Sequence, residues 1–367
     1  MKSSFLMILV IALIIAGLGI ISIYSGTYQK EGSLWQLTYQ RQILWVIIGL
    51  VCFLIISFVN YRPLWDWTYV LFGVAMVCLL LVFILGIVRL GAQRWLRLLW
   101  FNFQPSELVK LSVVVFLARY FSRKSIDDIG LISSRLGMFR GVLLPLFFVG
   151  IPMSMIIEQP DLGSGLMVLF TFIAMVYLAK IKIRYCIVLL VILLVPIPFL
   201  WQMLRDYQKE RLMVFLNPNI DPLGAGYTII QSKIAIGSGG LWGKGWLGGT
   251  QSQLHFLPEA HTDFIFATFG EEWGFIGGMF LFVLYFLLVR QGIVIARRTR
   301  DQFGRLLALG ISVMLGLQIF VNIAMTMGLA PVVGVPLPLM SYGGSSVVVT
   351  FISLGILSSI DRRKTMF

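Results

Sequence analysis

Long apolar runs separated by short polar segments dominate the hydropathy pattern of this 367-residue chain. Many of these runs approach 20 residues, the length that a helix needs to cross the hydrocarbon core of a bilayer. A transmembrane β-barrel would instead show short segments of alternating polarity. The pattern predicts an all-α polytopic membrane protein with about ten spans, at residues 4–24, 43–60, 69–89, 105–122, 139–158, 163–180, 183–203, 263–290, 305–327 and 342–360.

The first apolar run is longer than the hydrophobic region of a secretory signal peptide, and no small-residue cleavage site follows it. We therefore expect the run 4–24 to be a retained span. With the N-terminus in the cytoplasm, more of the 29 Lys and Arg residues fall in cytoplasmic segments, as the positive-inside rule requires. This topology places both termini in the cytoplasm, and it makes residues 204–262 a long extracytoplasmic loop between spans seven and eight. The whole chain, 1–367, forms one transmembrane domain.

Composition agrees with the hydropathy pattern, because 59% of the residues are hydrophobic and only 12% are charged. The formal net charge of +13 does not indicate nucleic-acid binding, since no basic stripe with interleaved aromatic residues lies outside the spans. The three cysteines all lie in apolar runs without metal-ligand spacing, so we expect small hydrophobic residues and no disulfide framework.

The extracytoplasmic loop is dense in glycine between residues 224 and 249. Its run YTIIQSKIAI is too short to span a membrane, so we expect it to lie at the interface or to re-enter the bilayer. Gly243, Gly245 and Gly248 form a G-x-G-x-x-G pattern, but no strand or βαβ unit surrounds it. We therefore assign these glycines to loop conformation and close backbone approach, and we expect no nucleotide site.

Acidic side chains cluster where the eighth span begins, in the stretch FLPEAHTDFIFATFGEEWG. Asp263 is explained about equally well as a helix N-cap or as a catalytic or ion-binding group. The neighbouring Glu259 and His261 favour a functional site. For Glu271 and Glu272, further along the span, we favour pairing or hydrogen bonding to another span over chemistry.

Several cations accompany a few carboxylates on the extracytoplasmic side. Such a set at membrane level suits a lipid-linked phosphate or diphosphate. Glu107 and Lys110, three residues apart on one helical face, are also placed to pair with each other. A rim of solvated surface charges remains the alternative explanation. The residues concerned are Arg94, Glu107, Lys110, Asp161, Arg211 and Lys233.

Six motifs in this order resemble those of the SEDS proteins (shape, elongation, division and sporulation), which are bacterial peptidoglycan glycosyltransferases. DPLGAGY, QSKIAIGSGGL and GTQSQ resemble the elongation branch, RodA, more than the division branch, FtsW. Leu99 and Ala260 depart from the usual residues without touching a proposed catalytic group. The motifs are 91-GAQRWL-96, 103-FQPSELVKL-111, 159-QPDLGSG-165, 217-NPNIDPLGAGYTIIQSKIAIGSGGLWGKGWLGGTQSQ-253, 257-LPEAHTDFIF-266 and 334-GVPLPLMSYGGSS-346.

The resemblance implies an inverting transfer that polymerises lipid II at the outer face of the bacterial cytoplasmic membrane during cell elongation. Asp263 matches the family's essential aspartate and would act as general base or as ligand to a divalent ion, Mg²⁺ or Mn²⁺. Arg94 and Lys110 would bind the diphosphate, with Glu107 orienting Lys110. The remaining expected substrate-binding residues are Asp161, Lys233, Arg211 and His261.

The resemblance also implies partners, namely a class B penicillin-binding protein, which is a transpeptidase, the nascent glycan strand and the elongation machinery. No nucleic-acid partner is expected. The chain lacks the S-x-x-K, S-D-N and K-T-G set of a transpeptidase. A lipid II flippase is the main alternative function, since a transporter would use the same cavity and cations without a base. A scaffold that only recruits cell-wall enzymes has little reason to keep acids at membrane depth.

Overall fold

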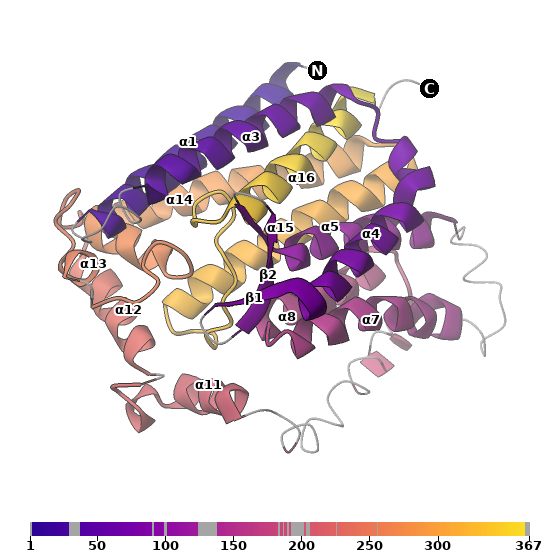
Figure 1. Ribbon diagram of the computed structural model, residues 1–367. Coiled ribbons are helices and arrows are strands. Elements are labelled where there is room, and N and C mark those ends of the chain that lie inside the picture. Colours follow the sequence, from indigo (N-terminus) through magenta and orange to yellow (C-terminus); the bar gives the residue numbers. More distant parts are fainter. Residues whose placement is uncertain are drawn as a thin grey trace.

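The computed structural model is a bundle of long helices, with several shorter helices gathered at one end (Figure 1). It describes residues 2–28, 37–89, 92–98, 101–123, 138–182, 184–185, 187–188, 191, 202, 206–224, 226–254 and 256–363. The predicted seventh span, 183–203, lies largely outside these residues.

Seven helices in the described part of the chain are long and apolar enough to cross a membrane. The predicted helical membrane architecture is thereby confirmed, although several predicted boundaries differ by a few residues. The seven candidate spans are Ser4–Thr27 in α1 (Lys2–Thr27), α3 (Thr38–Phe58), α4 (Pro63–Leu85), Phe139–Glu158, α14 (Ile265–Arg298), α15 (Gln302–Thr326) and α16 (Gly344–Arg363). The fourth of these combines a π-helical turn, Phe139–Leu143, with α7 (Leu144–Glu158).

Two further predicted spans form helices that are shorter or more polar. They are α5 (Pro105–Arg123), which corresponds to the run 105–122, and α8 (Leu162–Leu178), which corresponds to 163–180. The long loop contains α11 (Asp206–Leu216), a 3-10 turn (Pro218–Ile220), α12 (Tyr227–Ser238) and α13 (Thr250–Gln253). The run YTIIQSKIAI is therefore helical, and it packs against α14.

A small antiparallel sheet is an element that the all-α prediction did not include. Its strands are β1 (Gly86–Arg89), β2 (Ala92–Leu98) and β3 (Phe101–Phe103), in the order β1-β2-β3. The predicted third span, 69–89, therefore ends too late, because the helix stops at Leu85. The Gln93 side chain hydrogen-bonds carbonyl groups at the C-terminal end of α4. Its Nε2 donates to the carbonyls of Val82 (2.9 Å) and Gly86 (3.0 Å).

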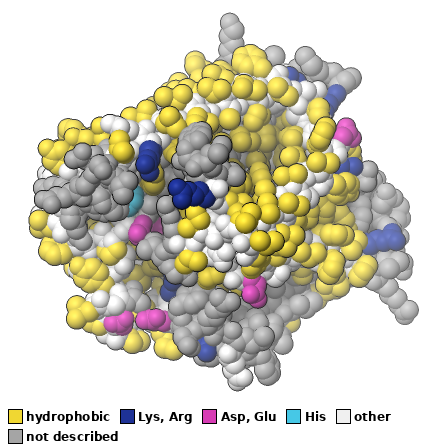
Figure 2. All heavy atoms as spheres, viewed as in Figure 1, with side chains coloured by type: hydrophobic (Ala, Val, Ile, Leu, Met, Phe, Trp, Pro, Cys, Tyr) yellow, Lys and Arg dark blue, Asp and Glu magenta, His cyan; other side chains and the backbone are white. Residues whose placement is uncertain are grey.

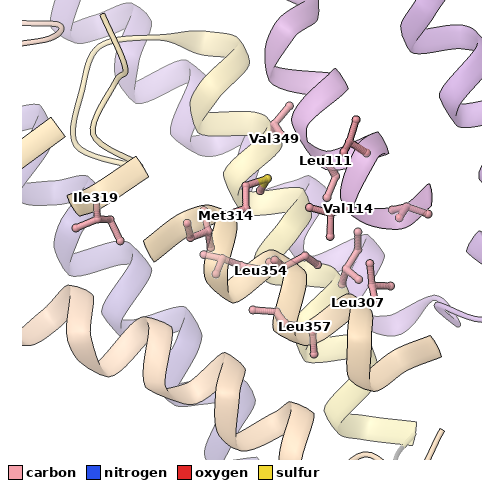
Figure 3. Packing of buried hydrophobic residues seen from close by; sticks show 14 of the residues in the cluster. Leu111, Val114, Leu307, Met314, Ile319, Val349, Leu354 and Leu357 are labelled. Atoms are coloured by element: carbon pink, nitrogen blue, oxygen red, sulfur yellow. The ribbon is translucent and has the colours of Figure 1, made fainter. Parts of the chain in front are cut away.

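The core lies where α15 and α16 pack against α5, and α15 also contacts α8 and α14. Figure 3 shows the interdigitated side chains from these helices. They include Leu111 and Val114 of α5, Leu307 and Met314 of α15, and Leu354 of α16, all of which are buried. Closely packed apolar side chains of this kind hold the helices that carry the polar groups in fixed positions.

Large apolar side chains also cover much of the outer surface (Figure 2). On α3 and α4 many of them are exposed, among them Ile47, Ile55 and Val77. A soluble monomer rarely exposes such continuous apolar surface, whereas lipid contact requires it. On the left half of the face in Figure 2, basic, acidic and histidine side chains gather among the apolar ones.

Candidate functional site

Asp263 lies in the turn that directly precedes α14. The residue at the helix N-cap is Phe264, and no side chain caps the helix. The N-cap interpretation of Asp263 is therefore wrong. Its carboxylate is partly exposed and accepts no hydrogen bond from the described residues.

The Asp263 backbone is fixed even though its carboxylate is not. Asn322, from the interior of α15, donates its Nδ2 to the carbonyls of Asp263 (2.9 Å) and Val335 (2.7 Å). A Cβ atom placed on Gly334, which has φ +72°, would lie 3.4 Å from the Asp263 Oδ2. The segment 331–343 therefore runs directly beside the carboxylate.

The turn before α14 is built around Glu259, a residue with a left-handed backbone (φ +50°). The Glu259 carbonyl accepts from the N–H groups of Thr262 (3.1 Å) and Phe264 (3.3 Å). The Thr262 hydroxyl donates to the Glu259 carboxylate (2.7 Å). These bonds close the turn, and none of them uses the Asp263 side chain.

Ser341 joins this turn to the segment 331–343. Its hydroxyl donates to the Thr262 carbonyl (2.7 Å) and accepts from the Leu337 N–H (2.8 Å). The Tyr342 N–H donates to the carbonyl of the buried His261 (3.0 Å), and the His261 and Tyr342 rings are 5.9 Å apart. His261 thus lies beside Asp263 in sequence and is anchored to the same segment.

The surroundings of Asp263 raise the pKa of its carboxyl group from an ordinary 3.8 to about 6. Removal from water is the largest cause, and the Glu259 carboxylate adds to it. Arg94 opposes the rise, Asp161 contributes to it and Arg211 opposes it. The charges of Arg94, Asp161 and Arg211 therefore act on the Asp263 carboxyl group. All three residues are among those that the sequence identifies.

Arg94, on β2, and Asp161, at the N-terminus of α8, form one unit. The Arg94 Nη1 lies 3.9 Å from the Asp161 Oδ1, and the Arg94 Nη2 donates to the Pro160 carbonyl. The Arg94 Nε is buried and has no hydrogen-bond partner among the described residues. One guanidinium donor is therefore left for a further acceptor.

Glu107 and Lys110 form a buried ion pair on α5, with 2.8 Å between the Lys110 Nζ and the Glu107 Oε1. The pairing that the sequence suggests is therefore present. Each side chain is only 2–3% exposed. An ammonium carries three donors, so this single bond leaves Lys110 two more.

Arg211 and Lys233 lie at different distances from the centre of this site. Arg211, on α11, donates to the Val332 carbonyl (3.2 Å), which places it beside the segment 331–343. Lys233, on α12, is exposed and lies against Gly328. Lys233, like Glu107 and Lys110, is not among the main charges that act on Asp263.

Asn322 and Ser341 are positioning residues that the sequence reasoning did not identify. The sequence could have indicated Asn322, because an amide inside the apolar run 305–327 must find polar partners. No local sequence pattern indicates the role of Ser341. Its partners, Thr262 and Leu337, lie in two turns that only the folded chain brings together. Glu259 was noted as a neighbour of Asp263 but not as the residue that shapes its turn.

Glu271 accepts hydrogen bonds from four donors, so its role is the structural pairing that the sequence favours, although the partners lie in the loop before α14 and not in another span. The Lys244 Nζ lies 2.7 Å away, the Thr250 hydroxyl 3.1 Å away and the Gln251 N–H 3.0 Å away. The Ser252 N–H adds a longer bond of 3.4 Å. Since Gln251 and Ser252 lie in the first turn of α13, this carboxylate caps that helix.

Helix α14 is broken at Gly274, which has φ +64°. The loop 239–245 supplies hydrogen bonds at the break. The N–H groups of Lys244 and Gly245 donate to the carbonyls of Glu271 and Glu272, each at 3.0 Å. The N–H of Phe275 donates to the carbonyl of Gly240 (2.9 Å) and that of Ile276 to Leu241 (3.1 Å).

Gly243 illustrates why this loop is rich in glycine. It has φ +81°, and a Cβ atom there would lie 2.1 Å from the Glu272 carbonyl oxygen. Only glycine permits both the backbone conformation and the approach. The prediction of loop conformation and close backbone approach for the G-x-G-x-x-G glycines is confirmed.

A divalent ion would have few protein ligands at Asp263. Among the described residues no group of three or more His, Cys, Asp and Glu side chains is arranged to hold a metal. The partly exposed Asp263 carboxylate, with unoccupied lone pairs, fits a Mg²⁺-type ion that takes its other ligands from substrate phosphates and water. An all-protein metal cage does not fit these residues.

A cavity of about 430 Å³ lies away from this site, between the α3–α4 and α14–α15 connections. Its lining includes Arg62, Asp66 and Asp301. None of the residues that surround Asp263 lines it, so it is not part of the candidate site.

Comparisons with known proteins agree with these motifs and this geometry. The chain is 43% identical over 345 residues to the peptidoglycan glycosyltransferase MrdB of Escherichia coli (strain K12), covering 94% of this chain and 90% of that protein. It is similar to a chain solved under the description "Structural coordination of polymerization and crosslinking by a peptidoglycan synthase complex" (TM-score 0.82, 32% identity, 98% of both chains). It is also similar to the rod shape determining protein RodA of Thermus thermophilus (TM-score 0.71, 28% identity, 98% of this chain and 96% of that chain).

The family model for FtsW, RodA and SpoVE, described as cell cycle proteins, matches residues 5–366. That match spans almost the whole chain, and the relatives above cover it to a similar extent. The chain therefore belongs to the FtsW/RodA/SpoVE family, the SEDS family that its motifs resemble.

Proposed function

We propose that this chain is a peptidoglycan glycosyltransferase that polymerises lipid II into glycan strands during cell elongation. The observation that carries the proposal is the environment of Asp263, a carboxylate that accepts no hydrogen bond from the described residues and on which the charges of Arg94 and Arg211 act. Membership of a family with relatives named as peptidoglycan glycosyltransferases supports it.

In the proposed reaction, the 4-hydroxyl of one sugar attacks the anomeric carbon of a sugar linked through an α-diphosphate to its lipid. A β-1,4 bond forms, the bond from the anomeric carbon to the diphosphate oxygen breaks, and the lipid diphosphate leaves with the electron pair. As general base, Asp263 takes the hydroxyl proton. A pKa of about 6 suits this role, because the group is ionised at neutral pH yet still basic.

The leaving diphosphate needs cationic partners, which Arg94 and Lys110 would supply. The spare Nε donor of Arg94 supports this role, as do the spare donors of Lys110. Glu107 orients Lys110, and Asp161 orients Arg94. Arg211, Lys233 and His261 complete the substrate-binding residues.

Asp263 has a second possible role as ligand to Mg²⁺ or Mn²⁺. Such an ion would neutralise charge on the diphosphate when bound. In that case the Asp263 carboxylate would hold the ion, and the hydroxyl proton would pass to solvent water. The two roles differ in whether chelation stops the reaction.

We also propose that the chain crosses the cytoplasmic membrane about ten times with both termini in the cytoplasm. The start of α1 and the end of α16 lie at one end of the bundle, opposite the turn before α14 (Figure 1). With both termini in the cytoplasm, Asp263 and the loop 204–262 would lie outside the cell. The proposed partners are a class B penicillin-binding protein and the elongation machinery, and the complex of a similar solved chain supports the first of them.

The test uses the chain purified with its cognate transpeptidase and supplied with lipid II, divalent cation and penicillin. Glycan polymer is measured for the native chain, for Asp263→Asn and for Glu210→Gln, a control that removes an exposed carboxylate on α11. Polymer from the native chain and the control, with none from Asp263→Asn, is expected. Loss of polymer with EDTA would show that the reaction needs a divalent ion and would favour the metal-ligand role of Asp263.

A lipid II flippase is the alternative from another class. It predicts that Asp263→Asn moves lipid II across liposomes at the native rate and that the native chain makes no polymer. The absence of polymer beside an active control polymerase would therefore overturn the proposed function.

A further inference from the structure

Glu272 is a buried acid that neither the candidate site nor the break in α14 explains. It is 1% exposed and lies at the C-terminal end of the first half of α14, just before Gly274. Its neighbour Glu271 pairs with Lys244 and caps α13. Within the described part of the chain, Glu272 has no cationic side chain at ion-pair distance.

Among the residues that the structure describes, a single side chain donates a hydrogen bond to Glu272. The Ser25 hydroxyl, near the end of α1, donates to the Glu272 Oε1. The Glu272 Oε2 is buried and has no hydrogen-bond partner among the described residues. The backbone N–H of Leu247 also interacts with this carboxylate, which still leaves the Oε2 without a partner among the described residues.

Gln253, in α13, completes the cluster. Its Nε2 donates to the Ser25 carbonyl (2.9 Å) and to the Ser25 hydroxyl (3.0 Å). Its own Oε1 is buried and has no partner among the described residues. The cluster Ser25–Gln253–Glu272 therefore ends with two unsatisfied acceptors, one of them on a carboxylate, and with all its side-chain donors used.

An unsatisfied buried acceptor is costly, and an uncompensated buried charge is more so. A metal cation satisfies several oxygen acceptors at once and requires no donor. Hard cations prefer such oxygen ligands. The negative end of a half-helix dipole, at a break inside a membrane helix, adds to this preference and is used for Na⁺ binding in discontinuous helices of transporters.

We propose that Glu272, Ser25 and Gln253 bind a monovalent alkali cation at the break in α14. The charge sets the valence, because the cluster offers one uncompensated carboxylate, whereas Glu271 is already neutralised by Lys244. The bound ion joins α1, α13 and the half of α14 that begins directly after Asp263. It stabilises this arrangement and takes no part in the chemistry at Asp263.

Ion binding is measured directly with ²²Na⁺ on the purified full-length chain in detergent, and its effect by thermal unfolding in sodium, potassium or choline chloride at equal ionic strength. We expect one ion per chain and a Tm higher by about 2 °C in sodium or potassium than in choline. No bound ion together with the same Tm in all three salts would show that water or a proton on Glu272 takes the place of the ion, and would overturn the proposal.

Three variants locate the effect. Glu272→Gln and Ser25→Ala should each abolish the difference between alkali and choline salts. Ser22→Ala, one turn earlier on α1, should keep it, since within the described ranges the Ser22 hydroxyl bonds to the Leu18 carbonyl alone (2.9 Å). If Glu272→Gln does not fold, Ser25→Ala decides, and a retained salt difference in that variant would sink the site. Because these readouts do not use lipid II, failure of the ion site and failure of the proposed glycosyltransferase are distinguishable.

Discussion

Asp161 and Asp263 are aspartates of the same site, yet the protein holds them in opposite ways. Asp161 is 2% exposed and caps α8 through the Ser164 N–H (3.2 Å). The Gln104 Nε2 and the Ser106 hydroxyl each lie 3.4 Å from its Oδ2, and Arg94 lies on its other oxygen. Its lone pairs are therefore already directed at protein donors.

Asp263 shows the reverse arrangement. Its backbone carbonyl is held by Asn322, but its carboxylate accepts no hydrogen bond from the described residues. Removal from water and the nearby Glu259 carboxylate raise its pKa, and no hydrogen bond from the described residues to the carboxylate offsets this rise. A carboxylate surrounded by hydrogen-bond donors is suited to position neighbouring side chains. A carboxylate without such donors is suited to accept a proton or to bind an ion.

The largest expected effect is a difference between two asparagine variants of the site. Asp263→Asn should lower the initial rate of glycan polymerisation by about 1,000-fold or more, because the amide neither accepts a proton nor binds a cation well. Asp161→Asn should lower it by about tenfold, since the amide oxygen still accepts the α8 cap bond. Rates are measured on lipid II in complex with the transpeptidase. Equal losses in the two variants would remove the distinction between them.

The pH dependence of the rate is the next largest effect. With a pKa of about 6, Asp263 is ionised above that pH and protonated below it. The rate should therefore fall roughly tenfold for each pH unit below 6. Asp161→Asn should keep this break, moved only slightly by the loss of a nearby negative charge. A profile that stays flat down to pH 5 would contradict the role of an ionised Asp263.

Hydrophobic runs determine much of this fold, which is why the sequence predicts most of its long helices. The run 305–327, for example, corresponds to Gln302–Thr326. The break at Gly274 was not predicted, because 263–290 was interpreted as one span and the acids within it do not mark a break in the backbone. Only the approach of loop 239–245 satisfies the interrupted backbone, and such long-range pairing leaves no local periodicity.

In the candidate site, too, local contacts could be predicted from the sequence and long-range contacts could not. The Glu107–Lys110 pair was foreseen, because helical spacing alone brings the two together. The cap of α8 by Asp161 could also have been read locally, since aspartate before a helix is a common N-cap. The hydrogen bonds by which Asn322 and Ser341 hold the turn of Asp263 could not be predicted in this way. They depend on two loops that meet at the end of α15.

A smaller expected effect concerns the stability of α8. Asp161→Ala removes the cap and leaves the donors of Gln104 and Ser106 without their shared acceptor, so we expect a loss of about 1–2 kcal/mol in the free energy of unfolding. Asp161→Asn should recover most of it. Thermal unfolding in detergent measures both variants. An alanine variant as stable as the native chain would mean that Asp161 is not the structural member of the pair.

The smallest expected effect is a gain in stability from Asp263→Asn. Because the pKa of Asp263 in the folded protein, about 6, lies above its ordinary 3.8, the folded state binds the proton more tightly than the unfolded chain. Stability therefore falls as the pH rises through this window, and the ionised group is a burden at neutral pH. The amide carries no charge, so Asp263→Asn should be more stable at neutral pH by about 1 kcal/mol.

This gain should itself depend on pH, and that dependence separates it from a general packing effect. Thermal unfolding of both chains is followed from neutral pH downward, with Asp161→Asn as the control that gains nothing. The advantage of Asp263→Asn should shrink below pH 6 and vanish near pH 4, where the native carboxyl is neutral in both states. A gain that persists unchanged at pH 4 would trace to packing, and the contrast between the two aspartates would then rest on hydrogen bonding alone.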